Sequence, residues 1–178
     1  MGLAGTGVRE LIEAHYDSLY RYAYRLTGSS ADAEDLTQDT FSKAMLRLSQ
    51  LREPDKAKGW LFRILRNAYL HKVRDQKRHR TVSLESVGDL PESAPDPATD
   101  IDPGKLQDVL NELDETFRTP LILFYFEDFS YRDIADQMDL PIGTVMSRLA
   151  RAKSYLRNRL DPNSDLTPEA KRRACHGL

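Results

Sequence analysis

The chain has 178 residues, of which 40% are hydrophobic and 30% charged, and its formal net charge at pH 7 is −2. This length suits one ordinary domain or two small ones, and the composition is typical of a soluble, mostly helical protein. The near-neutral charge argues against a protein that coats DNA by bulk attraction. No apolar run approaches the roughly 20 residues of a membrane span. Because there is no secretory signal and Cys175 is the single cysteine, we expect a cytoplasmic location.

Charged residues are sorted along the chain. Residues 61–80 contain seven Lys or Arg and one acid, residues 83–103 contain six acids and no base, and residues 147–159 contain five bases and no acid. Two basic segments therefore flank an acidic one.

The first 50 residues predict two amphipathic helices. Apolar residues recur at helical spacing over residues 8–26, and Gly28 suits the end of this helix. Ser29 or Ser30 can cap a second helix that runs to about Leu48. The inward stripe of the second helix is expected to comprise Ala33, Leu36, Thr37, Thr40, Phe41, Ala44, Met45 and Leu48.

A third amphipathic helix is predicted from about Gly59 to Arg78, after a polar break in which Pro54 disfavours helix. Trp60 flanks its apolar face, and we favour a core anchor over a stacking platform for this side chain. Three such helices with short connections predict a small bundle. The apolar face is expected to comprise Leu61, Ile64, Leu65 and Ala68, and the opposite face Arg63, Arg66, Asn67, Arg74 and Lys77.

Residues 81–102 are predicted to form a flexible or extended linker, because they are rich in proline and acids and show no sustained periodicity. Helical spacing resumes with Asp102 as the N-cap and Pro103 in the first turn. The tail, residues 161–178, is expected to be loose.

Residues 130–160 match the spacing of a helix-turn-helix motif. Ser130 and Asp133 are placed to form a capping box for a short helix, and Pro141 opens a longer one. Its buried stripe is expected to comprise Ile142, Val145, Met146, Leu149, Ala152, Leu156 and Leu160. The acid-free outer face carries Gly143, Thr144, Ser147 and Arg151, with Arg148 beside it. Since Arg, Ser and Thr bind bases or phosphates in a major groove, we favour DNA binding over a merely solvated basic helix.

Three segments resemble a known family. "HYDSLYRYAYRLTGSSADAEDLTQDTFSKAMLRL" and "KGWLFRILRNAYLHKVRD" resemble region two of the extracytoplasmic-function (ECF) sigma factors, and "YRDIADQMDLPIGTVMSRLARAKSYLR" resembles region four. The resemblance implies an all-α protein with two small helical domains, one a three-helix bundle and the other a helix-turn-helix unit. Region two would span residues 8–80, the acidic linker 81–102 and region four 103–160, followed by the tail 161–178.

Members of this family are promoter-recognition subunits of bacterial RNA polymerase. The resemblance therefore implies core polymerase and promoter DNA as partners, with no cofactor and no metal, and it leaves open whether an anti-sigma factor binds. The residues implied for the minus-ten element are Lys56, Lys58, Arg63, Arg66, Asn67 and Arg74. Those implied for the minus-thirty-five element are Gly143, Thr144, Ser147, Arg148 and Arg151.

Asp35 and Gln38 match positions that dock on the clamp helices of the largest polymerase subunit. The alternative is that acids here merely stabilise a helix N-terminus, a role that suits Asp32 better. The acids of the linker fit a segment that threads the polymerase cleft where nucleic acid later passes, and in the free protein they could instead shield the basic helices. On either account, we expect tight promoter binding only on polymerase.

Two other classes of protein were weighed against this interpretation. A stand-alone helix-turn-helix regulator would use the N-terminal bundle to sense a ligand or to dimerise, but a basic third helix is poor material for a ligand pocket. A helical enzyme is disfavoured because the four histidines form no motif with Cys, Asp or Glu at metal or nucleophile spacing.

Overall fold

The computed structural model describes residues 3–79 and 102–160, and these residues form helices and short connections without a strand. The prediction of an all-α protein with two helical units is confirmed. The linker prediction for residues 81–101 and the tail with Cys175 lie outside the described residues. The elements are α1 (Leu3–Thr27), α2 (Ser30–Leu46), η1 (Leu48–Gln50), η2 (Pro54–Lys56), α3 (Ala57–His79), α4 (Pro103–Glu112), α5 (Glu115–Tyr125), α6 (Tyr131–Met138) and α7 (Ile142–Leu160).

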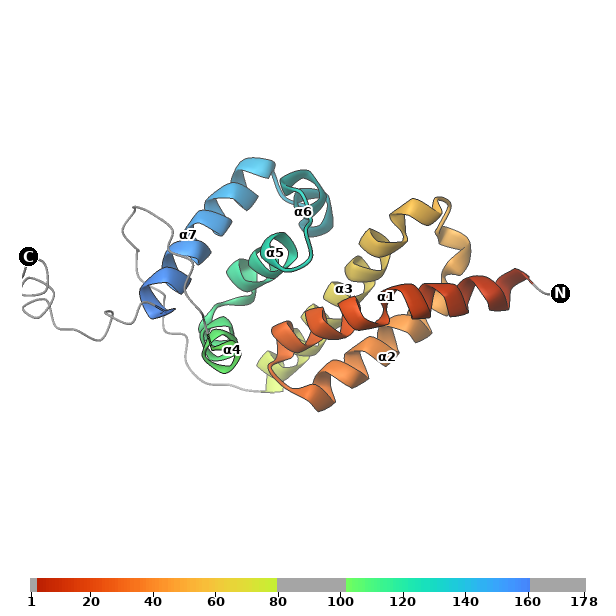
Figure 1. Cartoon of the computed structure of the whole chain (residues 1–178), viewed down its shortest axis with the longest axis horizontal. Coiled ribbons are helices and arrows are strands. Elements are labelled where there is room, and N and C mark those ends of the chain that lie inside the picture. The colour runs from red at the N-terminus through yellow and green to blue at the C-terminus, as the bar shows by residue number, and fades with distance from the viewer. Residues whose placement is uncertain (1–2, 80–101, 161–178) are drawn as a thin grey trace, which may run out of the picture.

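Helices α1, α2 and α3 pack side by side as the first unit (Figure 1). Gly28 ends α1 with a φ of +70°, and the Ser29 hydroxyl accepts a hydrogen bond from the backbone N–H of Asp32, as expected of an N-cap. An ion pair between Asp32 and Lys72 ties α2 to α3. The fully buried core side chains of this unit include Leu19, Tyr22 and Leu26 from α1 and Leu61, Phe62 and Leu65 from α3.

Helices α4 to α7 form the second unit, with α5 at its centre (Figure 1). Leu121, Ile122 and Leu123 of α5 are fully buried, because α6, α7 and α1 of the first unit pack against this helix. The side chain of Asp102 caps α4, as predicted.

The predicted helix-turn-helix is formed by α6 and α7. Ser130 and Asp133 make the expected capping box at the start of α6. Asp139 then ends α6 in the left-handed conformation, with a φ of 55°, which Asp tolerates better than most non-glycine residues. Ala135 of α6 and Val145 of α7 are both buried in the same core cluster, in agreement with the close approach expected of the two helices.

The predicted buried stripe of α7 is partly wrong. Val145, Leu149 and Ala152 are buried, but Ile142 is 42% exposed and Met146 is 51% exposed. Helix α7 packs against α4, α5 and α6, which bury Val145, Leu149 and Ala152, and Ile142 and Met146 lie at the edges of this stripe and face solvent. Met45, predicted to face inward from α2, is exposed where α2 gives way to η1.

The two units share one continuous apolar cluster. The ring of Phe62 in α3 lies 4.9 Å from that of Tyr22 in α1 and 5.2 Å from that of Phe129, which precedes α6. All three rings are buried. At these rings the units are therefore packed together through buried side chains. Within the described residues, no helix has both the length and the apolar composition needed to cross a bilayer.

Replacing Leu65 by Ala tests the core. We expect Leu65→Ala to lower the free energy of unfolding by about 2–5 kcal/mol, because it removes buried methyl groups and leaves a cavity. The measurement is urea denaturation followed by circular dichroism. The matched control is Leu46→Ala, whose residue is 86% exposed and should change stability by no more than about 0.5 kcal/mol. Equal losses in the two variants would contradict this assignment of the core.

Candidate nucleic-acid interface

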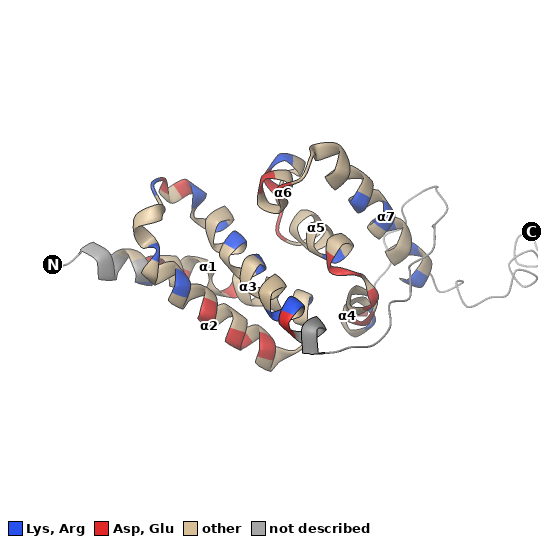
Figure 2. Ribbon diagram, turned by 180° about the vertical axis from the view of Figure 1, so that it is seen from behind, with Lys and Arg blue, Asp and Glu red and all other residues tan. Residues whose placement is uncertain are grey.

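One face of α3 carries the cations that the sequence assigns to the minus-ten element. Arg63, Asn67 and Arg74 are exposed along this face, while Lys58 and Arg66 are half-buried. Arg63, Arg66, Asn67 and Arg74 share one side of the helix because spacings of three, four and seven residues return to the same face, and Lys58 lies at the start of the helix. Figure 2 shows basic residues along α3 and α7, and acidic residues gathered on α2.

Lys56 lies just before α3, in η2. Its ammonium group makes an exposed ion pair with Glu53, with an N–O distance of 2.9 Å. An exposed pair of this kind contributes little to stability, so it leaves Lys56 free to exchange Glu53 for a phosphate.

The outer face of α7 is open to solvent. Gly143, Ser147 and Arg151 are exposed, and Thr144 and Arg148 are half-buried beside them. A side chain added at Gly143 would meet no atom within 4 Å, so the start of the helix offers its backbone to a large partner. The Ser147 hydroxyl donates to the carbonyl oxygen of Thr144 at 3.0 Å and keeps its acceptor lone pairs available.

The C-terminal end of α7 is bonded to α4 and not open to a partner in the same way. Glu112 of α4 accepts hydrogen bonds from the Tyr155 hydroxyl at 2.7 Å and from Arg159 at 2.6 Å. Hydrogen bonds from these two groups lower the pKa of Glu112. The candidate DNA surface of α7 is thereby limited to its first half.

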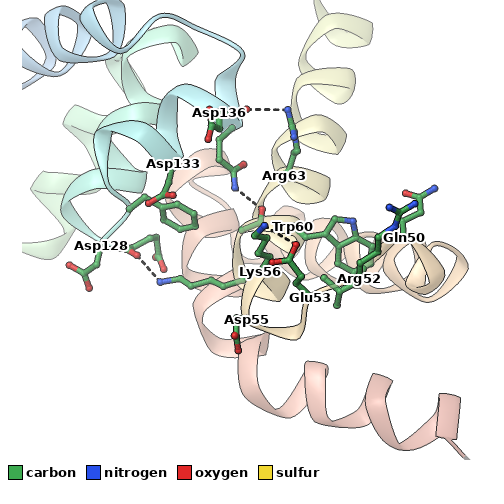
Figure 3. A pocket seen from close by; sticks show the side chains of 16 residues that line it. Gln50, Arg52, Glu53, Asp55, Lys56, Trp60, Arg63, Asp128, Asp133 and Asp136 are labelled. Atoms are coloured by element: carbon green, nitrogen blue, oxygen red, sulfur yellow. Dashed lines mark hydrogen bonds and ion pairs between the residues drawn. The ribbon is translucent and has the colours of Figure 1, made fainter.

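The cations of α3 also contact the second unit, which the sequence did not predict. Arg63 donates to the carbonyl oxygen of Asp136 at 3.0 Å, and Arg66 donates to that of Gln137, also at 3.0 Å. Lys58 donates to the carbonyl oxygen of Glu127 at 2.6 Å. Figure 3 shows Arg63 and Asp136 meeting at this junction.

Arg66 has several positive neighbours. Burial lowers the pKa of Arg66, and the nearby Arg63, Arg74 and Arg148 lower it further. The structure therefore brings Arg148 of α7 close to the cations of α3. Like charges gathered in this way favour the approach of a polyanion.

Glu127 is a buried carboxylic acid at the same junction, with only 3% of its surface exposed. Burial raises its pKa, against the opposing effect of Lys58, Arg25 and Arg21, and Asp128 raises it further. The cost of removing the carboxylate from water therefore exceeds the attraction of the three cations.

Three further contacts join the units away from the α3 cations. Arg118 donates to the Tyr69 hydroxyl at 2.7 Å, and the guanidinium carbon of Arg25 lies 4.1 Å from the centre of the Phe126 ring. Gln107 donates to the carbonyl oxygen of Arg25 at 3.2 Å. Sequence reasoning missed these residues because nothing local marks them.

Trp60 was expected to be a core anchor rather than a stacking platform. It is half-buried and packs against the core cluster. Its remaining surface lines a groove of about 670 Å³ that also touches Lys56, Arg63 and Asp133 (Figure 3). The core role is therefore correct, and part of the ring still faces the groove between the units.

The residues predicted to contact polymerase lie on α2. Asp35 and Gln38 are exposed on α2, and Asp35 lies about one helical turn further along the helix than Asp32. Asp32 differs from both, because its hydrogen bond with Lys72 occupies its carboxylate and lowers its pKa. The structure thus separates an acid that holds the bundle together from two side chains that are free to meet a partner.

Comparison with known proteins identifies the two units. Residues 11–79 match Sigma-70 region 2, and residues 104–156 match Sigma-70, region 4. The ECF RNA polymerase sigma factor SigE of Mycolicibacterium smegmatis is 37% identical over 166 residues, which cover 90% of this chain and 64% of that protein. The ECF RNA polymerase sigma factor SigL of Mycobacterium tuberculosis is 32% identical, with coverage of 84% and 86%.

A solved structure agrees with these matches. The sigma factor RpoE in complex with the anti-sigma factor NepR from Bartonella quintana superimposes with a TM-score of 0.72 at 30% sequence identity, covering 87% of this chain and 97% of that one. Two helical units with these matches, in this order, define an RNA polymerase sigma factor. The chain belongs to the ECF family of these factors.

Replacing Glu127 by Gln tests the buried carboxyl. A raised pKa means that the folded state holds the proton more tightly than the unfolded state, so stability falls as pH rises above the ordinary carboxyl value. We expect Glu127→Gln to have a higher melting temperature than the parent at pH 7, and the difference to vanish at pH 4. Calorimetry at both pH values gives the answer. The control is Glu34→Gln, which changes an exposed carboxyl. If the stability of the parent chain rises between pH 4 and pH 7 relative to that of Glu127→Gln, the raised pKa of Glu127 is refuted.

Proposed function

We propose that the chain directs core RNA polymerase to specific promoters by binding two promoter elements, and that it acts in the cytoplasm without catalysing a reaction itself. The observation that carries the proposal is the pair of basic, largely acid-free helical faces on units that match sigma regions two and four. Within the described residues, no three His, Cys, Asp or Glu side chains lie close enough to hold a metal ion.

The α3 face is the proposed minus-ten surface. Lys56, Lys58, Arg63, Arg66 and Arg74 would bind phosphates of the opened strand, and Asn67 would donate or accept a hydrogen bond with a base or the backbone. Exposure of Arg63, Asn67 and Arg74 along one side of the helix supports this assignment.

The first half of α7 is the proposed minus-thirty-five surface. Arg148 and Arg151 are the leading candidates for contacts with guanine or phosphate, with Thr144 and Ser147 beside them. The open space around Gly143 supports a close approach of the duplex to the start of the helix, where backbone N–H groups attract phosphate.

Two protein partners are proposed. Asp35 and Gln38 would dock on the clamp helices of polymerase, which their exposure on α2 supports. An anti-sigma factor is the second, because the RpoE structure from Bartonella quintana contains the anti-sigma factor NepR. The alternative of a stand-alone helix-turn-helix regulator has no specific observation in its favour.

Run-off transcription tests the proposal. The purified chain and bacterial core polymerase are combined on a library of promoter templates, and we expect transcripts from a subset of templates only when the chain is present. A chain with both Asp35→Ala and Gln38→Ala should lose transcription and association with polymerase while retaining the folded circular dichroism spectrum. If the parent chain does not associate with core polymerase, the proposal fails.

Arg151→Ala distinguishes two roles of this side chain. If Arg151 reads guanine, we expect a loss of about 1–3 kcal/mol in binding to the preferred minus-thirty-five sequence and a relaxed preference at one base pair. If it holds phosphate, binding should weaken evenly across sequences and the salt dependence should become shallower. Lys153→Ala, an exposed change on α7 away from this face, is the control. Unchanged DNA binding in Arg151→Ala would exclude both roles.

A further inference from the structure

We propose that α6 and the connection before it occupy part of the minus-ten surface of α3 in the free chain, at Lys58, Arg63 and Arg66, so that this contact and promoter DNA exclude one another there. The inference rests on the proposed function, because it assigns the α3 cations to promoter DNA. We call the arrangement the α3–α6 contact. It comprises Lys58, Gly59, Phe62, Arg63 and Arg66 on one side and Glu127, Phe129, Asp136 and Gln137 on the other.

The acceptors in this contact have the chemistry of a weak anion. Asp136 and Gln137 lie in the last turn of α6, where helix carbonyl groups lack intrahelical partners and carry partial negative charge. The backbone N–H groups of Asp139 and Leu140 both bond to the carbonyl of Ala135, so neither takes up those two carbonyls. Arg63 and Arg66 satisfy them instead, as they would satisfy phosphate oxygens.

Gln137 makes the contact reciprocal. Its backbone carbonyl accepts from Arg66, and its side-chain amide donates to the carbonyl oxygen of Gly59 at 2.6 Å. Lys58 bonds to the carbonyl of Glu127 and lies 5.1 Å from the centre of the Phe129 ring. The second unit therefore occupies the beginning of α3 through polar and aromatic groups together.

Coverage of the two DNA surfaces is unequal. Lys58 and Arg66 are half-buried and already bonded within the chain, so a phosphate reaches them only after α6 moves away. By contrast, Gly143, Ser147 and Arg151 on α7 are exposed in the same arrangement, with Thr144 and Arg148 half-buried beside them. In the free chain, Lys58, Arg63 and Arg66 of the minus-ten surface are thus already bonded to the second unit, while Lys56, Asn67 and Arg74 remain exposed.

The same contact contains features that favour its release. Three buried side-chain atoms of its residues have no hydrogen-bond partner among the described residues, and these are Nε of Arg66, Oε1 of Glu127 and Oε1 of Gln137. Buried polar atoms without partners oppose packing, and so does the gathering of positive charge around Arg66. A partner that binds either unit more tightly when they are apart can therefore open the contact.

The first test removes one side of the contact without touching the α3 cations. In the free full-length chain, Gln137→Ala should bind a fluorescent single-stranded oligonucleotide of the minus-ten element about three- to tenfold more tightly than the parent, as expected for loss of the one side-chain hydrogen bond to Gly59. Binding of a minus-thirty-five duplex should stay within about twofold. The control is Asn158→Ala, which removes an exposed amide from α7. Equal oligonucleotide affinity in Gln137→Ala and the parent, with intact circular dichroism, would overturn the proposal.

A second measurement does not depend on how well Gln137→Ala folds. A side chain placed at Gly59 would lie 3.6 Å from the amide nitrogen of Gln137, so a chain carrying Gly59→Cys, Gln137→Cys and Cys175→Ser can be bridged by a short bifunctional thiol reagent. We expect the bridged chain to bind the minus-ten oligonucleotide at least about tenfold more weakly than the same chain unbridged, with unchanged binding of the minus-thirty-five duplex. Equal minus-ten binding before and after bridging would overturn the proposal.

Run-off transcription distinguishes failure of the α3–α6 contact from failure of the proposed function. If the parent chain supports transcription on core polymerase but neither Gln137→Ala nor the bridge alters minus-ten binding by the free chain, the coverage of α3 is refuted and the proposed function stands. If the parent chain gives no promoter-specific transcript on core polymerase, the proposed function is refuted, and the exclusion of promoter DNA that rests on it is overturned as well.

Discussion

The structure depends on a constraint imposed by α3, a helix whose two faces both require a partner. Its apolar face, with Leu61 and Leu65, holds the three-helix bundle together. Its cationic face is partly removed from water, and a half-buried guanidinium such as that of Arg66 must find an acceptor. Backbone carbonyls at the end of α6 supply that acceptor in the free chain. The need of the Arg66 guanidinium for a hydrogen-bond acceptor thus links the stability of the first unit to the position of the second.

Helix α6 consequently has two tasks. Through Ile134 and Ala135 it supports α7 in the helix-turn-helix, and through its last turn it meets α3. The left-handed conformation of Asp139 lets one short helix do both, because the chain turns away before the terminal carbonyls are covered by a further turn of helix. The geometry that presents α7 to a duplex is therefore the geometry that exposes a negative helix end toward the other unit.

Sequence reasoning succeeded where the cause is local. The caps at Ser29, Ser130 and Asp133 follow from side chains that satisfy backbone N–H groups within three residues, and the structure has all of them. The stripe of α7 was predicted too wide, since periodicity alone does not reveal how little of α7 the eight residues of α6 cover. The contact from Arg63 to Asp136 could not be predicted at all. Its acceptor is a backbone carbonyl 73 positions away, and every residue has one.

Gly28 is constrained by a neighbouring side chain as well as by its backbone conformation. Its positive φ alone explains why the chain can reverse between α1 and α2, but a Cβ there would also lie 2.7 Å from the amide atoms of Asn111 in α4. Asn111 is itself held by Gln107, which bonds to the last turn of α1. A bulkier residue at this hairpin would therefore displace the Asn111 amide and disturb its hydrogen bond with Gln107, at a site remote from every DNA-facing cation. Substitution of Gly28 should thus weaken the packing of α4 against α1 without altering which bases are read.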